Sequence, residues 1–541
     1  MRTNHGVRIL DPLAISRDRL RAALTATLAL AAGGVGTANA SELRGLANDG
    51  VPETCASGSA DCFTLLGVSI EGARAIPNSE LAEIYTPFLT RQADMTDLAR
   101  IAERITARYR ARGYFLSYAT VPPQPAGGVA RILVHEGRIG EVVVEGDGAE
   151  RIQSYLAGLQ EAPIADLRDL ERRLGFAGDA PGMSVRSRME PIEGDIHRLV
   201  VTANYEARSA NVFVDNRGTP AMDELRAYAR VAANGVFADR DQAALAVFTA
   251  PRSPSEYTFV EASWAYAFEN GAWLRASAGM SRSNDGADLL SADIGGDSEI
   301  VSLNYEFPII RTRRAGLWLS AGFDSLHQEN DWSDGSGAYA DELRVVRAGI
   351  RGTLDDAGRS TTVIVQTSFG LDAFGASEAS PMRRSRADAD ARFFKIDGFA
   401  SHYRDLGRHF GVYGAVSGQW SAEPLLGAEE FTAGGAVFGR AFGYGEISGD
   451  RGLAASLELR AGFDPEGALL SFAQGYAFVD AAQVWNDGGG GQDLASAGAG
   501  VRLTLQDRVT AGFELARPID RTPSEETDRD WRQFFSLSAS Y

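Results

Sequence analysis

Apolar and polar residues alternate along the chain from about residue 208 onward, in segments of about ten residues separated by Gly, Asp, Asn and Ser. The final segment shows the pattern most clearly, because Phe535, Leu537 and Tyr541 interleave with serines. Successive side chains of a strand point to opposite faces, so one face of such a segment can meet lipid while the other meets water. The pattern therefore predicts an antiparallel β-barrel that spans a membrane.

The number of these segments indicates how the barrel begins and ends. The sheet must close on itself, because unpaired backbone groups cost several kcal/mol each in lipid. An even number of strands places both ends of a single-chain barrel on the same side of the membrane. We predict sixteen strands, at residues 209–216, 224–235, 242–250, 255–268, 272–283, 298–308, 315–327, 340–352, 360–372, 388–400, 409–421, 452–463, 472–485, 494–506, 508–517 and 531–541.

The stretch before the barrel has helical spacing as well as strands. Leu98, Ile101 and Ile105 recur every three or four residues, so one face of a helix should be buried there. Residues 63–136 predict a β-α-α-β-β module, with elements at 63–72, 77–88, 96–112, 114–121 and 129–135. The order recurs over residues 137–207, at 139–145, 150–160, 165–176, 184–191 and 197–206. The predicted fold class is therefore two α+β modules followed by an all-β transmembrane barrel at 208–541.

The N-terminus is typical of an exported protein. Arginines at positions 17, 19 and 21 precede an apolar run at 22–32 and the small-residue site at 38–40. We predict a signal peptide over residues 1–40 and a periplasmic leader over residues 41–62. Disulfides persist in the compartment that export reaches, so Cys55 and Cys62 are predicted to form a structural bridge. A metal site is disfavoured at this place, because no histidine lies nearby.

Composition narrows the possible functions. The net charge of −19 argues against a nucleic-acid-binding protein, which normally has a basic face. No apolar stretch long enough for a membrane-spanning helix follows the first 40 residues. The chain has no GxSxG, HExxH or P-loop motif, and its six histidines are dispersed. We therefore predict no enzymatic activity, no catalytic residues, no cofactor and no metal.

A glycine-rich stretch at residues 434–460 interrupts the strands of the barrel. Its loop glycines can adopt positive φ, so the segment can fold back on itself instead of continuing as a strand. The backbone positions that we single out for this fold are Gly434, Gly435, Gly439, Gly443, Gly449 and Asp450. A folded loop that carries one arginine, Arg440, needs a partner for that charge.

The alternation in a later segment indicates such a partner. Along residues 475–485, Tyr476, Phe478 and Asp480 share one face, opposite Ala477 and Val479. An aspartate on the lipid face of a barrel would be costly. We therefore expect Asp480 to point inward.

These patterns resemble a known family. The β-α-α-β-β order resembles the polypeptide-transport-associated (POTRA) domain. The signal peptide, two such modules and a sixteen-stranded barrel together resemble the TpsB transporters of two-partner secretion, the haemolysin-activator (ShlB/FhaC/HecB) family within the BamA superfamily. The most specific motifs are FGRAFGYGEISGDRGLAASLELR at 438–460 and GYAFVDAAQVW at 475–485.

The resemblance implies roles for particular residues. The first motif corresponds to a long loop between barrel strands 11 and 12 that folds into the pore, here at about 422–452. Arg440 corresponds to the arginine at the loop tip, Phe442 to its aromatic residue and Asp480 to the carboxylate of the inner wall. Ala441 departs from the family, in which glycine is usual, and a positive φ there would cost about 1 kcal/mol.

The function that the resemblance implies is secretion of an unfolded exoprotein through the barrel of an outer-membrane protein. The periplasmic POTRA modules would capture the exoprotein, and an Arg440–Asp480 latch would hold the loop in the pore until it is displaced. Outer-membrane lipid and the barrel-assembly machinery are the other expected partners. Tyr541 would serve as part of the assembly signal, although an interfacial aromatic residue is an equally good interpretation.

Several alternatives remain open at this point. The modules could be spacers, and Arg440 could be a solvated loop charge. A passive porin is disfavoured, because a diffusion channel has no need of peptide-binding modules. An assembly and insertion factor of the same superfamily is a closer alternative, and two modules instead of a longer array favour secretion over insertion.

Overall fold

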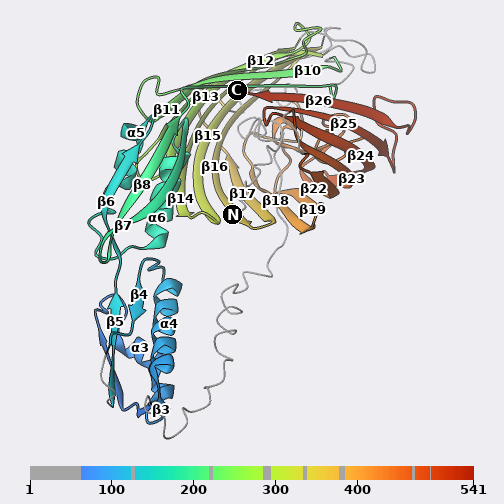
Figure 1. Ribbon diagram of the computed structural model, residues 1–541. Helices are drawn as coiled ribbons and strands as arrows, with labels where there is room; N and C mark the ends of the chain where they lie inside the picture. Colours follow the sequence, from blue (N-terminus) through green and yellow to red (C-terminus); the bar gives the residue numbers. More distant parts are fainter. Residues whose placement is uncertain are drawn as a thin grey trace. The chain divides into compact units, whose positions relative to one another are not determined.

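The computed structural model describes residues 62–123, 128–218, 223–283, 294–332, 338–376, 384–465, 469–487 and 489–541 (Figure 1). The predicted signal peptide and most of the predicted leader lie outside these residues. So does Cys55, and the predicted bridge to Cys62 therefore stays a prediction. Among the described residues, the boundary between two compact units falls between Tyr205 and Glu206.

The first module of the N-terminal unit has the predicted β-α-α-β-β order. Its three-stranded sheet has the order β2-β5-β4, in which β2 runs parallel and β4 antiparallel to β5. None of the described helices is long and apolar enough to cross a membrane. The elements of the module are β2 (Gly67–Glu71), α3 (Asn78–Tyr85), α4 (Met95–Ala111), β4 (Tyr118–Thr120) and β5 (Val129–His135).

Helix α4 illustrates why this module folds as it does. Asp94 caps its N-terminus, accepting a hydrogen bond from the Asp97 amide at 2.9 Å, and the Asp97 side chain accepts one from the Asp94 amide. The predicted apolar face is buried, with Leu98, Ile101 and Ile105 packed between the helix and the sheet. The N-terminal end and the buried face of the helix are therefore encoded locally.

One helix pair of this module is held by charges. Glu80 of α3 accepts hydrogen bonds from Arg108 at 3.0 Å and from Arg112 at 2.7 Å. These two guanidinium groups hold the pKa of Glu80 below its usual value. The ion pairs join α3 to α4.

The predicted strand at 63–72 is divided in two by the fold. Phe63–Thr64 forms β1, which pairs with β3 (Gln92–Ala93), and only the later part forms β2. Leu65 between them is fully buried in the core of the module. Because Leu65 is apolar, it continued the strand-like pattern across the gap, so the sequence predicted one strand instead of two.

The second module repeats the architecture with the sheet order β6-β8-β7. Its core lies between this sheet and its two helices. Among the described residues, the long strand β7 is an outer strand that pairs only with β8. The elements are β6 (Arg138–Glu145), α5 (Ala149–Leu156), α6 (Leu167–Asp179), β7 (Met183–Glu193) and β8 (Ile196–Tyr205).

The C-terminal unit is a closed antiparallel barrel in which β26 pairs with β9, so the predicted sixteen-stranded barrel is confirmed (Figure 1). The sixteen strands are β9 (Arg208–Asp215), β10 (Arg226–Asn234), β11 (Asp241–Thr249), β12 (Thr258–Ala267), β13 (Trp273–Ser283), β14 (Ile294–Arg311), β15 (Ala315–Trp332), β16 (Ala338–Asp356), β17 (Arg359–Gly370), β18 (Phe394–Gly407), β19 (Phe410–Ser421), β22 (Arg451–Phe463), β23 (Leu470–Trp485), β24 (Gly491–Leu505), β25 (Val509–Pro518) and β26 (Arg532–Ser540).

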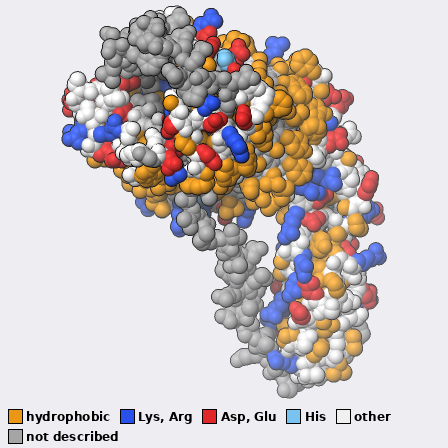
Figure 2. Space-filling model, turned by 180° about the vertical axis from the view of Figure 1, so that it is seen from behind, with side chains coloured by type: hydrophobic (Ala, Val, Ile, Leu, Met, Phe, Trp, Pro, Cys, Tyr) orange, Lys and Arg blue, Asp and Glu red, His pale blue; other side chains and the backbone are white. Residues whose placement is uncertain are grey.

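The outer wall of the barrel is apolar, and Figure 2 shows hydrophobic side chains gathered over it. Met280, Val301 and Leu537 are each about half exposed or more, at 63%, 55% and 48%. Along β22 and β23 the side chains alternate between buried and exposed over most of each strand, as the sequence pattern predicts. The buried polar side chains of these strands, Ser456, Glu458, Gln474 and Asp480, therefore line the interior.

One strand begins later than predicted. The apolar residues Ala389, Ala391 and Phe393 were expected within a strand at 388–400, but β18 begins at Phe394. They are buried in a loop, where they pack with Leu425 and Leu426. Burial by another loop gives the same local signal as burial in a strand, because both require apolar side chains.

Candidate functional site: a loop folded into the barrel

The segment between β19 and β22, residues 422–450, folds into the barrel as a short hairpin. It contains the 3-10 helix η4 (Gly427–Glu429), followed by β20 (Phe431–Ala433) and β21 (Ile447–Gly449), which pair antiparallel. We call this segment the pore loop and residues 439–442 its tip. Apolar residues of the loop and of the wall form one buried cluster, which includes Phe431, Phe442 and Phe478.

Glycines give the pore loop its shape in two ways. Gly434, Gly435 and Gly439 have positive φ, at 114°, 90° and 82°. Gly443 and Gly449 do not, and a Cβ at Gly449 would lie 3.0 Å from the carbonyl oxygen of Trp485, so that position is shaped by close packing. Gly445, which the sequence analysis did not single out, also has positive φ.

The tip accommodates the residue that departs from the family pattern. Ala441 is fully buried and does not have positive φ, so it carries no left-handed strain. Phe442 is 1% exposed within the apolar cluster. The alanine therefore does not disturb the fold of the tip.

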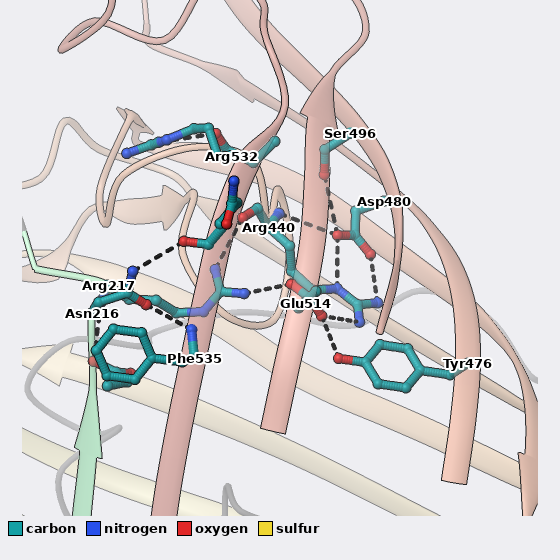
Figure 3. Close-up of polar contacts among 12 residues, drawn as sticks. Asn216, Arg217, Arg440, Tyr476, Asp480, Ser496, Glu514, Arg532 and Phe535 are labelled. Atoms are coloured by element: carbon teal, nitrogen blue, oxygen red, sulfur yellow. Dashed lines mark hydrogen bonds and ion pairs between the residues drawn. The ribbon is translucent and has the colours of Figure 1, made fainter. Parts of the chain in front are cut away.

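The structure brings Arg440 and Asp480 together (Figure 3). Nε of Arg440 donates to Oδ2 of Asp480 at 3.0 Å, and Nη2 donates to Oδ1 at 3.0 Å. The backbone N–H of Arg440 donates to the same carboxylate at 3.2 Å. The two residues are 3% and 1% exposed. This two-point geometry is the strong form of an arginine–carboxylate contact.

Other wall residues complete the surroundings of the guanidinium group. Nη1 donates to Glu458 at 2.6 Å and lies 3.5 Å from a carboxylate oxygen of Glu514. Nη2 donates to the hydroxyl group of Ser456 at 2.9 Å. The guanidinium carbon lies 3.7 Å from the ring centre of Phe478. Each nitrogen of the group therefore has an acceptor, and its face lies on an aromatic ring.

Sequence reasoning did not select Ser456, Glu458 or Glu514, although the alternation could have found them. Ser456 and Glu458 are buried residues of β22 and lie on its inward face, in the SLELR part of the motif. Glu514 is likewise a buried residue on the inward face of its strand, β25. An acidic residue in an alternating strand points inward by the argument that placed Asp480. Which of these carboxylates meets Arg440 depends on strand register, which the pattern does not determine.

The tip arginine belongs to a larger charge cluster on the inner wall. Glu458 also pairs with Arg460 at 2.6 Å and with Arg502 at 3.3 Å. Glu514 accepts a hydrogen bond from Tyr476 at 2.7 Å and pairs with Arg217. Because these partners are themselves fixed, the wall presents a preformed site for the guanidinium group of Arg440.

A second group of charges holds the loop where it leaves β19. Glu429 of η4 is 4% exposed and pairs with Arg347 at 2.6 Å and with the fully buried Lys395 at 2.5 Å. Lys395 also donates to the backbone oxygen of Glu429 at 2.9 Å. Arg347 in turn contacts Asp324 at 2.5 Å. We call Glu429, Arg347 and Lys395 the root cluster.

Asp450, predicted as part of the loop backbone, fixes the return of the loop to β22. Its carboxylate accepts hydrogen bonds from Arg386 at 2.6 Å, from the Leu425 amide at 2.8 Å and from the Asp487 amide at 3.1 Å. Arg386 also pairs with Glu430 at 2.6 Å. The two ends of the pore loop are thus joined to each other through Arg386 and Asp450.

Tyr541 lies away from the pore loop, at the end of the strand pair that closes the barrel. Its backbone N–H and oxygen both bond to Ala210, at 2.9 Å each, and the residue is 82% exposed. The pairing belongs to the backbone, and the ring faces outward. Its role as an assembly signal stays a prediction.

The pore loop as a whole is held inside the barrel by non-covalent contacts. The lumen-facing partners of Arg440 are carboxylate, hydroxyl and aromatic side chains, and none of these contacts is covalent. Removing one partner of a buried ion pair is costly, because the other charge is then left buried without a counter-charge. These non-covalent contacts therefore hold the loop in one position inside the barrel.

Comparison with known proteins agrees with this architecture. Residues 63–137 match the model of the POTRA domain, ShlB-type. Residues 198–503, more than half of the chain, match the model of the haemolysin secretion/activation protein ShlB/FhaC/HecB.

The individual relatives are named as an outer membrane transporter and as a heme/hemopexin transporter. The outer membrane transporter CdiB of Dickeya dadantii is 24% identical over 478 residues, 84% of each chain. The heme/hemopexin transporter protein HuxB of Haemophilus influenzae is 22% identical over 467 residues, 82% of this chain and 81% of the relative. The structure of CdiB from Escherichia coli superposes with a TM-score of 0.75 at 20% identity, covering 91% of this chain and 93% of that one. The chain belongs to the ShlB/FhaC/HecB family of haemolysin secretion/activation proteins and is an outer-membrane transporter rather than an enzyme.

Proposed function

We propose that this protein is the translocator of a two-partner secretion system, in which the POTRA modules recognise an unfolded exoprotein and the barrel secretes it. In this proposal Arg440 and Asp480 form a latch that holds the pore loop in the lumen until the exoprotein displaces it. The observation that carries the latch is the buried two-point contact, with Nε–Oδ2 and Nη2–Oδ1 distances of 3.0 Å each. A solvated loop charge would have no such enclosure.

The modules offer an edge at which an extended chain can pair. Strand β7 has eleven residues and is an outer strand of its sheet, so the side away from β8 has unpaired backbone groups. An incoming strand gains main-chain hydrogen bonds there, and its affinity grows with the paired length. The other outer strands of the two sheets are shorter, with eight residues in β6, five in β2 and three in β4. We therefore assign exoprotein capture to β7.

Deletion of the gene tests secretion itself. The expected result is that one large polypeptide disappears from the medium and accumulates in the periplasm, where it is degraded, and that the gene in trans restores it. A general fall in outer-membrane proteins, with no single missing extracellular protein, would instead support an assembly and insertion factor. An unchanged set of extracellular proteins would contradict secretion.

Site-specific photo-crosslinking tests capture at β7. A photoreactive amino acid in place of Ser187, which is exposed on β7, is expected to crosslink to the exoprotein during secretion. The matched control replaces Arg172, an exposed residue of helix α6 in the same module. Equal crosslinking from both positions would show non-specific proximity and would contradict pairing at the edge of β7.

A further inference from the structure

The strands that close the barrel pair over a shorter length than the other neighbouring strands. β26 and β9 pair through five residue pairs, from Ser536 with Asp215 to Ser540 with Asn211. The next shortest interfaces, such as β9 with β10 and β25 with β26, have eight pairs each. We call the β26–β9 interface the seam. The seam is therefore the shortest strand interface of the barrel wall, although Tyr541 and Ala210 add two backbone hydrogen bonds at its end.

Beyond the Asp215 end of this pairing, a side chain continues the seam. The amide group of Asn216 accepts a hydrogen bond from the N–H of Phe535 at 2.8 Å and donates to the oxygen of Gln533 at 3.0 Å (Figure 3). Asn216 thus extends the pairing just beyond the end of β9, and its backbone N–H also donates to the oxygen of Phe535 at 3.4 Å. The seam is therefore extended by specific side chains at the level where the pore loop lies.

The tip of the pore loop contacts both sides of the seam at this level. Nη1 of Arg217, two residues beyond the end of β9, donates to the backbone oxygen of Arg440 at 2.9 Å. Nη1 of Arg532, the first residue of β26, donates to the backbone oxygen of Ala441 at 3.0 Å. Adjacent carbonyl groups of the tip are therefore held by one arginine just beyond the end of the first strand and one at the start of the last strand.

Both arginines are oriented by other contacts. Arg217 pairs with Glu514 of the wall, and its guanidinium carbon lies 3.8 Å from the ring centre of Phe534. Arg532 pairs with Glu526 at 3.4 Å and lies 5.4 Å from the same ring. Phe534 is itself 6% exposed and packs in the apolar cluster of the pore loop. The two arginines are thus placed around one aromatic residue of β26.

We infer that Arg217 and Arg532 are positioning residues that hold the loop tip from the two sides of the seam, so that the resting loop ties β9 to β26. The inference rests on the proposed function in one respect, that the loop leaves this position during secretion. Displacement of the tip then removes the tie, and the seam becomes the part of the wall that loosens. The pore loop in this way couples the state of the pore to the closure of the barrel.

Hydrogen exchange of the full-length protein in lipid nanodiscs tests the tie. Arg532→Met is expected to raise the exchange rate of amides in β9 and β26 by about tenfold, because a charge-assisted hydrogen bond across the seam is lost. Arg217→Met is expected to do the same. Exchange in β13 and β14 should stay unchanged in both variants. Arg532→Lys, which keeps a donor at this position, should restore most of the protection.

A matched control separates this effect from a general one. Arg529 lies in the loop before β26 and donates to the backbone oxygen of Ile519 at 3.0 Å, but it does not contact the tip. Arg529→Met should leave exchange at the seam unchanged. The inference is overturned if Arg217→Met and Arg532→Met leave the seam unchanged, or if either raises exchange in β13 and β14 as much as at the seam.

The experiments distinguish a failure of the latch hypothesis from a failure of the tie hypothesis. If Asp480→Asn opens the channel but leaves exchange at the seam as in the unsubstituted protein, the latch stands and the tie is wrong. If Asp480→Asn leaves the conductance unchanged, the latch is wrong, whereas the Arg217 and Arg532 variants still decide on the tie.

Discussion

Asp480→Asn is expected to raise the single-channel conductance of the barrel and to reduce secretion of the exoprotein strongly. The Asp480 carboxylate accepts hydrogen bonds from the Arg440 backbone, from two guanidinium nitrogens of Arg440 and from Ser496 at 3.2 Å. An asparagine side chain has the same shape but only one acceptor oxygen and no charge. The tip would therefore lose its two-point contact and leave its resting position more often.

The size of the effect follows from burial. Breaking a buried ion pair by removing one partner costs about 3–5 kcal/mol. Since Glu458 still faces Arg440 at 2.6 Å, we expect the lower end of that range. A loss of about 3 kcal/mol shifts the ratio of released to latched loop by about 100-fold. Single-channel recording in planar bilayers measures this ratio, and immunoblotting of the medium measures secretion.

The chain offers a sharp set of controls for this experiment. Arg314→Met removes an exposed ion pair at 3.8 Å, in which the two side chains are 75% and 51% exposed, and should change neither readout. Arg440→Lys should behave as Asp480→Asn, because an ammonium group cannot make the two-point contact. Full secretion and unchanged conductance in both Asp480→Asn and Arg440→Met would refute the latch.

A charge swap is not expected to restore the latch. Exchanging Arg440 and Asp480 would place an aspartate beside Glu458 and Glu514, which lie 2.6 and 3.5 Å from the arginine. Three carboxylates would then lie together at the tip, where each disfavours the charged form of its neighbours, and the new arginine would stand at the wall position instead of between them. The doubly substituted protein should therefore secrete no better than the single variants.

Glu429→Gln is expected to detach the other end of the loop and to lower the thermal stability of the barrel. The substitution leaves the fully buried Lys395 and the 11%-exposed Arg347 without the carboxylate that they share. The cost of such a loss is about 3–5 kcal/mol. The expected result is a lower unfolding temperature in detergent, followed by circular dichroism and by the heat-dependent shift of the band in gel electrophoresis.

Glu423 provides the matched control for the root cluster. It is an exposed carboxylate of the same loop, six residues earlier, and it accepts one hydrogen bond from the Phe394 amide at 3.0 Å. Glu423→Gln should lower the unfolding temperature far less than Glu429→Gln. Equal shifts would mean that the buried charges of the root cluster do not stabilise the loop.

The tip and the root cluster share no contacting residue, so the stability effects of substitutions at the two sites should add. The partners of Arg440 lie on β22, β23 and β25, whereas those of Glu429 lie on β16 and β18. Effects of distant sites without shared partners add to within about 0.5 kcal/mol. Asp480→Asn combined with Glu429→Gln should therefore show the sum of the two stability changes.

Local sequence was sufficient for the elements of this fold. Strand and helix periods repeat within a few residues, so alternation predicted the sixteen strands, and three- and four-residue spacing predicted helix α4. The inward position of Asp480 followed from the same alternation. Where a strand boundary was wrong, as before β18, apolar residues were buried by a loop instead of by the wall.

The tertiary structure decided which side chains meet. Arg217 and Glu514 are 297 positions apart in the chain, and closure of the barrel alone makes them neighbours. Glu458, Arg532 and the root cluster likewise join the pore loop through strand register and loop packing. A period in sequence determines the face of a strand on which a residue lies, but it contains no information about the partner across the lumen. The sequence by itself therefore determined the barrel, the modules and the inward aspartate. Only the folded chain decided how the loop is held and that its tip contacts arginines on the two sides of the seam.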